Sequence, residues 1–211
     1  MNIDPSVVIR IPVLLFAVVL HESAHGWMAD KCGDPTARLM GRITLNPIPH
    51  IDLFGSVILP LILIISNSPF MIGWAKPVPV NYNNLRNPKR DAAFVGIAGP
   101  MSNLIVAAIA LLFFKLTNEI SLPLILGVQL LFQYIFIINL VLAVFNLIPI
   151  PPLDGSRVVS AILPVDLAIK YNKMEPYGFF IIMALMYTGL LDKIFTPILF
   201  LVEYLLHLLI F

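Results

Sequence analysis

The chain has 211 residues, of which 59% are hydrophobic and only 12% are charged. A soluble domain carries about 25% charged residues, so this composition excludes an ordinary water-exposed globule and predicts lipid as the solvent. The net charge of +1 gives no indication of nucleic-acid binding. The single cysteine, Cys32, excludes a disulfide framework and a thiolate metal cluster.

About six apolar segments follow one another along the chain, and they predict an all-α integral membrane protein. They cover residues 6–27, 51–66, 92–116, 122–148, 177–191 and 194–211. The first segment lacks the residue order of a cleaved signal peptide and is predicted to be retained. The short connections predict one polytopic domain over residues 1–211, with a core at 6–160 and C-terminal helices at 177–211.

Two connectors, residues 31–51 and 67–91, are rich in Pro, Gly and Asn. Within them, GRITL and KPVPV have the β-branched character of short extended segments, and their prolines suit edge strands or turns. We therefore expect a small β element beside the helices.

Basic residues predict the orientation of the chain. They concentrate in three connectors, at residues 31–42, 76–90 and 157–173, which the positive-inside rule places in the cytoplasm. The first two connectors flank segment 51–66, so this segment must return to the side it left, as a re-entrant hairpin. The prediction is a multi-pass protein of the cell membrane, with Lys115 and Asp192-Lys193 on the side opposite the cytoplasm.

The motif His21-Glu22-Ser23-Ala24-His25 interrupts the first apolar segment. On a helix, positions i and i+4 lie on one face, so both imidazoles can reach one metal ion, with Glu22 beside it as a general base. Three ionisable residues in five are expensive in a membrane and indicate function. Histidines that merely bond neighbouring helices would leave Glu22 unexplained.

A catalytic zinc ion needs a third protein ligand and an open position for water. Asp154 follows the fourth apolar segment, and if that helix runs parallel to the first, Asp154 and the two histidines share a membrane depth. Asp30 and Asp52 are the alternatives. Asp154 could instead belong to an ordinary Asp-Gly turn.

Three separated motifs resemble the site-2 protease family of intramembrane zinc metalloproteases, in its compact branch without PDZ or CBS domains. They are HESAH, Gly99-Pro100-Met101-Ser102-Asn103 and FNLIPIPPLDG. The resemblance implies one catalytic Zn²⁺ with Asp154 as the third ligand, and it places Asn146 and Asn103 near the site. It also implies that the substrate is a transmembrane helix of another protein.

The two asparagines have alternative interpretations. Asn146 lies in a proline-broken segment that lines the expected site, and we expect its amide to contact substrate backbone or the oxyanion. Asn103 has the same candidate role, but a buried asparagine also commonly bonds another helix. Asn139 is expected to be structural, and His50 to line the entrance to the site without being a ligand.

These observations predict an intramembrane zinc metalloprotease that hydrolyses peptide bonds within or near transmembrane segments of other proteins, the reaction of regulated intramembrane proteolysis. A membrane metal transporter is the first alternative, but it would not need Glu22 and would need further ligands along a pathway. A non-catalytic pseudoprotease is the second, but the catalytic residues are all present. We expect the active site toward the cytoplasmic side of the membrane, with the small β element near it. The sequence does not predict the oligomeric state.

Overall fold

The computed structural model describes residues 7–66, 74–118, 123–193, 195–197, 200 and 204. Every regular element in these ranges is helical, as expected of an all-α protein. In chain order the elements are α1 (Val7–Cys32), α2 (Thr36–Leu39), η1 (Ile48–His50), η2 (Leu53–Ile58), α3 (Leu59–Ile65), η3 (Tyr82–Asn84), α4 (Pro88–Asn118), α5 (Pro123–Asn146), α6 (Gly155–Ile162), α7 (Val165–Asn172), η4 (Glu175–Tyr177) and α8 (Gly178–Tyr187).

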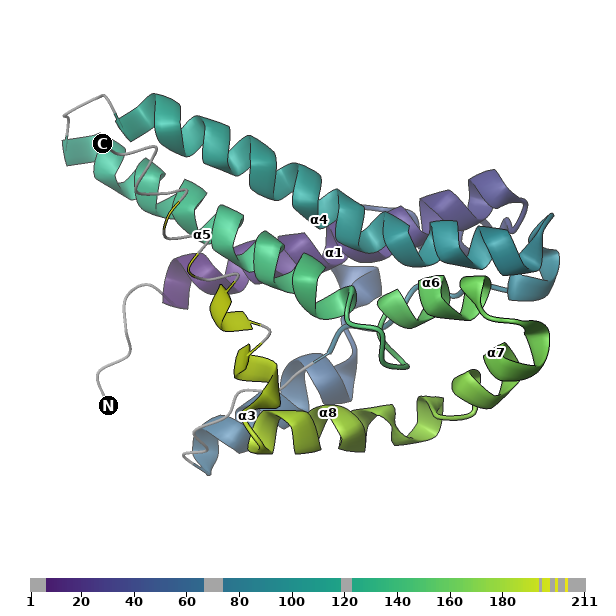
Figure 1. Ribbon diagram of the computed structural model, residues 1–211. Helices are drawn as coiled ribbons and strands as arrows, with labels where there is room; N and C mark the ends of the chain where they lie inside the picture. The colour runs from purple at the N-terminus through teal and green to yellow at the C-terminus, as the bar shows by residue number, and fades with distance from the viewer. Residues whose placement is uncertain are drawn as a thin grey trace.

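Three long helices, α1, α4 and α5, pack against one another and form the centre of the fold (Figure 1). Where α4 meets α5, the small side chains of Ala107 and Ala110 are buried against Phe136, which allows the two helices to approach closely. On the outer side of α4, by contrast, Ile109 and Leu112 remain 50% and 57% exposed. An apolar surface of this kind is what lipid tails would cover.

The three long helices contain the stretches Val8–Cys32, Pro88–Thr117 and Ile125–Asn146, each long and apolar enough to cross a membrane. A fourth span is present if the bent pair Val165–Tyr187 and Leu190–Pro197, which meet at 77°, counts as one. The chain is therefore a membrane protein with three to four candidate spans among its described residues.

The C-terminal part differs from the two apolar segments expected at 177–191 and 194–211, with Asp192-Lys193 between them. Helix α8 ends at Tyr187, and Gly189 adopts a φ of 68°, a left-handed conformation that glycine tolerates. The break therefore lies before Asp192-Lys193 and not at these residues. With 10 residues, α8 is about 15 Å long and too short to cross a bilayer alone. Most of the segment expected at 194–211 lies outside the described residues.

The expectation of a β element is wrong for the described residues, where GRITL forms turns and bends and KPVPV has no regular secondary structure. The reason lies in the backbone groups of the connector at residues 74–81. Pro77 and Pro79 have no N–H, and the N–H of Val78 donates to the Glu22 carboxylate. The carbonyls of Lys76 and Pro77 accept from Arg42. Side chains thus take the groups that a strand ladder would use.

The apolar segment after the first connector begins with two short helical elements. Elements η2 and α3 follow each other directly, and Asp52 caps the start of η2 by accepting from the Gly55 N–H. Residue 74, the next described residue, lies beside the start of this segment, because the Trp74 N–H donates to the Gly55 carbonyl at 3.1 Å and Ser56 Oγ donates to the Trp74 carbonyl. Residues 67–73, through which the sequence predicts the return, lie outside the described residues.

Candidate metal centre

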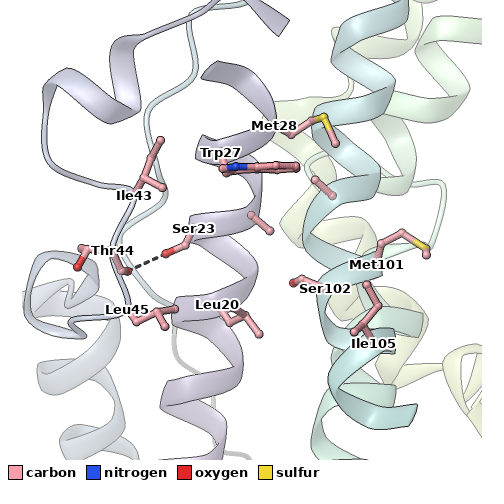
Figure 2. Close-up of a pocket in the computed structure, with 12 residues that line it drawn as sticks. Leu20, Ser23, Trp27, Met28, Ile43, Thr44, Leu45, Met101, Ser102 and Ile105 are labelled. Atoms are coloured by element: carbon pink, nitrogen blue, oxygen red, sulfur yellow. Dashed lines mark hydrogen bonds between the residues drawn. The ribbon is translucent and has the colours of Figure 1, made fainter. Parts of the chain in front are cut away.

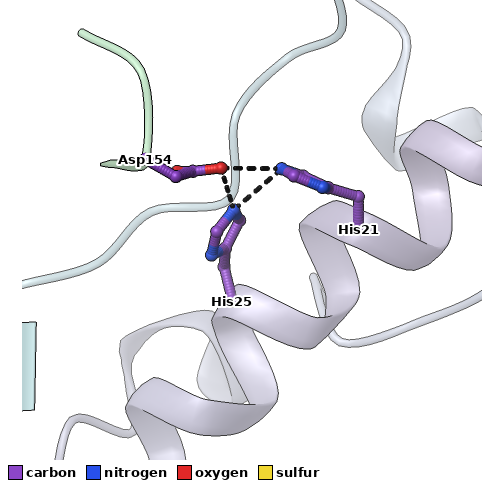
Figure 3. Close-up of side chains that lie close together, drawn as sticks. All are labelled: His21, His25 and Asp154. Atoms are coloured by element: carbon purple, nitrogen blue, oxygen red, sulfur yellow. Dashed lines mark hydrogen bonds and ion pairs between the residues drawn. The ribbon is translucent and has the colours of Figure 1, made fainter. Parts of the chain in front are cut away.

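Two histidines of α1 and one aspartate of the loop between α5 and α6 converge on a single point (Figure 3). Asp154 Oδ2 lies 3.0 Å from His21 Nε2 and 3.2 Å from His25 Nε2. The two Nε2 atoms are 3.0 Å apart. Both histidines are buried, with 6% and 9% of their surfaces exposed. Residues 133 positions apart in the chain, His21 and Asp154, therefore meet in the protein interior.

The Nδ1 contacts of the two histidines indicate that both Nε2 atoms and Asp154 Oδ2 present lone pairs to one another. His25 Nδ1 lies 2.6 Å from the Val95 carbonyl, and His21 Nδ1 lies 2.6 Å from Asn103 Oδ1. Both partners are acceptors, so each Nδ1 carries the ring hydrogen and each Nε2 of a neutral ring is bare. Asp154 Oδ2 is buried and has no hydrogen-bond donor. Three hydrogen-bond acceptors thus face one another with no hydrogen between them, an arrangement that a bound cation would stabilise.

The spacing of the three atoms suits zinc. Zinc binds histidine nitrogen at about 2.0–2.1 Å and carboxylate oxygen at about 2.0–2.2 Å with tetrahedral geometry, which separates ligand atoms by roughly 3.4 Å. The three separations of 3.0, 3.0 and 3.2 Å are close to this value. Three protein ligands also leave the fourth position that catalytic zinc sites keep open.

Helix α4 makes room for the centre by lacking a side chain at Gly99. A Cβ at this position would lie 2.4 Å from His25 Nε2 and 2.6 Å from His21 Cε1, inside the two rings. In the sequence, Gly99 was notable only as the first residue of the motif Gly99-Pro100-Met101-Ser102-Asn103. Its steric role becomes visible only when α4 is packed against α1.

Two more glycines leave room for the loop that carries Asp154 to pack closely. A Cβ at Gly96 of α4 would lie 3.0 Å from the Asp154 carbonyl oxygen. A Cβ at Gly155 would lie 2.2 Å from the Leu147 carbonyl oxygen, at the other end of the loop. The loop therefore folds tightly on itself and lies directly against α4, which brings Asp154 within reach of the histidines.

Asn103 is fully buried and completes a hydrogen-bond chain across the three long helices. Its Nδ2 donates to the Ala17 carbonyl at 3.2 Å and to Asn139 Oδ1 at 2.8 Å. Asn139 in turn donates to the Ile135 carbonyl. Both amide hydrogens of Asn103 are thereby engaged, and its oxygen faces His21. Both donors of Asn103 thus bond neighbouring helices, and its expected contact with substrate or the oxyanion stays a prediction.

The other residues considered from the sequence lie as follows. Glu22 accepts from the Val78 N–H at 2.7 Å and does not belong to the three converging atoms. Asn146 is half-buried and donates to the Leu142 carbonyl one turn earlier. Asp30 pairs with Arg38 at 2.9 Å, and Asp52 caps η2. His50 is buried, with Nε2 3.0 Å from the Thr44 carbonyl.

An apolar groove of about 540 Å³ runs beside the centre, between α1, α4 and residues 43–45 (Figure 2). Ser23 and Ala24, which separate the two histidines in the chain, line it from α1, and the Ser23 hydroxyl donates to the Thr44 carbonyl. Met101 and Ser102, which follow Gly99, line it from α4. The groove thus borders the same two helix turns that hold the metal centre.

Comparison with known proteins identifies the family. The sequence profile of peptidase family M50 matches residues 10–189. The chain belongs to peptidase family M50. A candidate zinc metalloprotease of Bacillus subtilis, YwhC, is 38% identical over 190 residues, which cover 88% of this chain and 83% of YwhC. No solved structure matches the chain.

Two more distant relatives are also named as zinc metalloproteases. A candidate zinc metalloprotease of Mycolicibacterium smegmatis, Rip2, is 26% identical over 88% of this chain and 69% of its own length. The zinc metalloprotease MJ0392 of Methanocaldococcus jannaschii is 30% identical over 72% of this chain but only 33% of its own length. The resemblance to site-2 proteases is thus confirmed, and this M50 protein is an intramembrane zinc metalloprotease with Zn²⁺ as its metal.

Proposed function

We propose that this M50 protease hydrolyses peptide bonds within or near transmembrane helices of other membrane proteins. We further propose that residues 1–211 act as one domain, with the catalytic core at 6–160. The observation that carries the proposal is the convergence of three bare acceptor atoms on one point inside an apolar helix bundle, with a carboxylate on the adjacent residue of the same helix.

In this proposal His21, His25 and Asp154 hold the zinc ion. When bound, zinc polarises the scissile carbonyl and lowers the pKa of water to about 7. Glu22 accepts a proton from the attacking water and then delivers it to the leaving amine nitrogen, as a general base and then a general acid. The carbonyl of Val95 and the side chain of Asn103 keep the two imidazole rings oriented through their Nδ1 hydrogens.

Asn146 retains its proposed contact with substrate backbone or with the oxyanion. Its amide nitrogen carries two hydrogens, and the bond to the Leu142 carbonyl uses one of them. It also lies at the C-terminal end of α5, where the loop to Asp154 begins.

For the topology we propose that segment 51–66 is re-entrant and that the basic connectors face the cytoplasm of a cell membrane. The hydrogen bond between Trp74 and Gly55 supports a return to the starting side. Single cysteines at Asn83, Asn118 and Asn172, in a Cys32→Ser background, test this arrangement. Positions 83 and 172 should be labelled from the cytoplasm and position 118 from outside. Labelling of 83 and 172 from opposite sides would refute the hairpin.

The test of the proposed activity compares the wild type with Glu22→Gln after purification in detergent. Each protein is assayed for zinc content and for cleavage of a panel of tagged single-pass membrane proteins. The expected result is cleavage of at least one panel member by the wild type alone, with the same zinc content in both. A variant that turns over as fast as the wild type would remove Glu22 from the mechanism.

A further inference from the structure

The connector at residues 74–81 lies along the catalytic turn of α1 and touches Glu22. The Val78 N–H donates to Glu22 Oε2 at 2.7 Å, a short bond to a carboxylate. These two residues are 56 positions apart in the chain, so the contact is made by tertiary packing. It engages one carboxylate oxygen and leaves the other for a proton from water.

The local sequence makes Val78 the single backbone donor at this point. Val78 stands between Pro77 and Pro79, neither of which has an N–H. A proline also disfavours helical backbone at the residue before it, so Pro79 favours an extended conformation at Val78. A connector serving only as a link between helices would not need this pattern.

Several contacts fix the connector against α1 on both sides of Val78. The buried Arg42 donates through Nη2 to the Lys76 carbonyl at 2.8 Å and to the Pro77 carbonyl at 3.2 Å. Beyond Val78, the Asn81 N–H donates to the buried Asp34 at 2.7 Å. The Val78 side chain itself fits against Gly26, where an added Cβ would lie 2.9 Å from Val78 Cγ1.

We propose that the Val78 amide is a positioning group for Glu22 and that Arg42 acts through it by clamping the connector. The donor holds the Glu22 carboxylate at one place and in one plane. Gly26 directly follows the ligand His25, so the notch that seats Val78 belongs to the same helix turn as the metal centre. This inference rests on the proposed role of Glu22 as general base.

The decisive variant is Val78→Pro, which removes the N–H and keeps an extended backbone. Its matched control is Val80→Pro, the same change after Pro79, where the described part of the chain shows no hydrogen bond from the amide. A second pair of variants, Arg42→Met and Arg42→Lys, removes the hydrogen bonds from Arg42 to the connector completely or in part. Each protein is assayed with the single-pass test protein that the wild type cleaves, for kcat, KM, zinc content and thermal midpoint.

General acid–base groups contribute about 10²–10⁴-fold to rate, so displacing Glu22 should lower kcat of Val78→Pro by at least about tenfold. We expect KM to stay within about twofold and zinc to remain stoichiometric, because this amide is bonded to Glu22 and not to any of the three residues that could hold the metal. Arg42→Met should lose kcat in the same way, and Arg42→Lys, which keeps a donor, should recover part of it. Val80→Pro should keep most of the wild-type kcat.

Wild-type kcat in Val78→Pro, with Glu22→Gln inactive, would overturn the inference while leaving the proposed function intact. Loss of zinc or of thermal midpoint in parallel with kcat, equally in Val78→Pro and Val80→Pro, would show a merely structural bond and would also overturn it. An active Glu22→Gln would instead refute the base itself. If Val78→Pro does not fold, the Arg42 pair decides: kcat loss with full zinc supports the clamp, and unchanged kcat refutes it.

Discussion

Replacing Gly99 with alanine tests the geometry of the metal centre most directly. The new Cβ would lie 2.4 Å from His25 Nε2 and 2.6 Å from His21 Cε1, where such atoms need about 3.4 Å or more. The rings cannot retreat freely, because Val95 and Asn103 hold their Nδ1 atoms at 2.6 Å. A displacement of about 1 Å is half of a zinc–nitrogen bond of about 2.1 Å.

We expect the affinity of Gly99→Ala for zinc to fall by about 100-fold, equivalent to about 2.7 kcal/mol, with loss of proteolysis. Helix propensity acts in the opposite direction, since alanine in a helix interior is favoured over glycine by about 0.8–1.0 kcal/mol. The two effects are separated by Gly127→Ala in α5, where an added Cβ meets nothing within 4 Å. This control should bind zinc normally and be as stable as the wild type or more so.

The assay is competition for zinc with a chromophoric chelator, on purified protein in detergent, together with metal content after dialysis. Gly99→Ala should release its zinc to the chelator at concentrations that the wild type and Gly127→Ala resist. A Gly99→Ala variant with full metal content and unchanged affinity would refute the packing of α4 against the two imidazoles.

Three further predictions concern single side chains. Asp154→Ala should lower zinc occupancy in the same competition assay and abolish cleavage, and full occupancy would mean that another residue supplies the third ligand. Asn103→Leu removes the acceptor for His21 Nδ1–H and should weaken zinc binding by about 10–100-fold; unchanged affinity would show that the ring needs no such partner. Asp34→Asn should destabilise the protein at pH 7 by about 1.5–3 kcal/mol, measured by thermal unfolding, and the difference from wild type should shrink near pH 3; a constant difference would contradict this.

The sign of the Asp34 effect follows from its surroundings. Burial by itself raises the pKa of this carboxyl, but hydrogen bonds from Thr36, Asn84 and Asn81 outweigh burial and lower the pKa below its ordinary value. A group whose pKa is lower in the folded protein stabilises the fold above its unfolded pKa of about 3.9. This contribution is lost as the pH falls through the folded pKa, so acid should remove the advantage of Asp34 over asparagine.

The three long helices could be predicted because hydropathy is read from consecutive residues. Their ends could not be placed in the same way. Helix α1 continues to Cys32 through Asp30 and Lys31, and α4 begins at Pro88, before the apolar run. Polar residues continue a helix whose hydrogen bonds are already in place, so hydropathy marks the lipid-facing part of a helix and not its whole length.

The β element shows a different limit. The β-branched residues of KPVPV favour a strand, but the structure assigns no strand to them. A strand also needs a neighbour with free backbone groups, and here the side chains of Glu22 and Arg42 take those positions. Local preference alone therefore could not predict the partners of the connector, which its surroundings decided.

By itself, the sequence determined that His21 and His25 share one face of a helix, because the helical period is set by local hydrogen bonds and needs no partner. It also indicated Asp154, through its motif and the expected membrane depth. Only the tertiary structure decided that α4 must lack a Cβ at Gly99 and that the Val78 amide meets Glu22. These contacts depend on how closely separate backbones approach, and that distance is set by packing across the whole bundle, which no local pattern encodes.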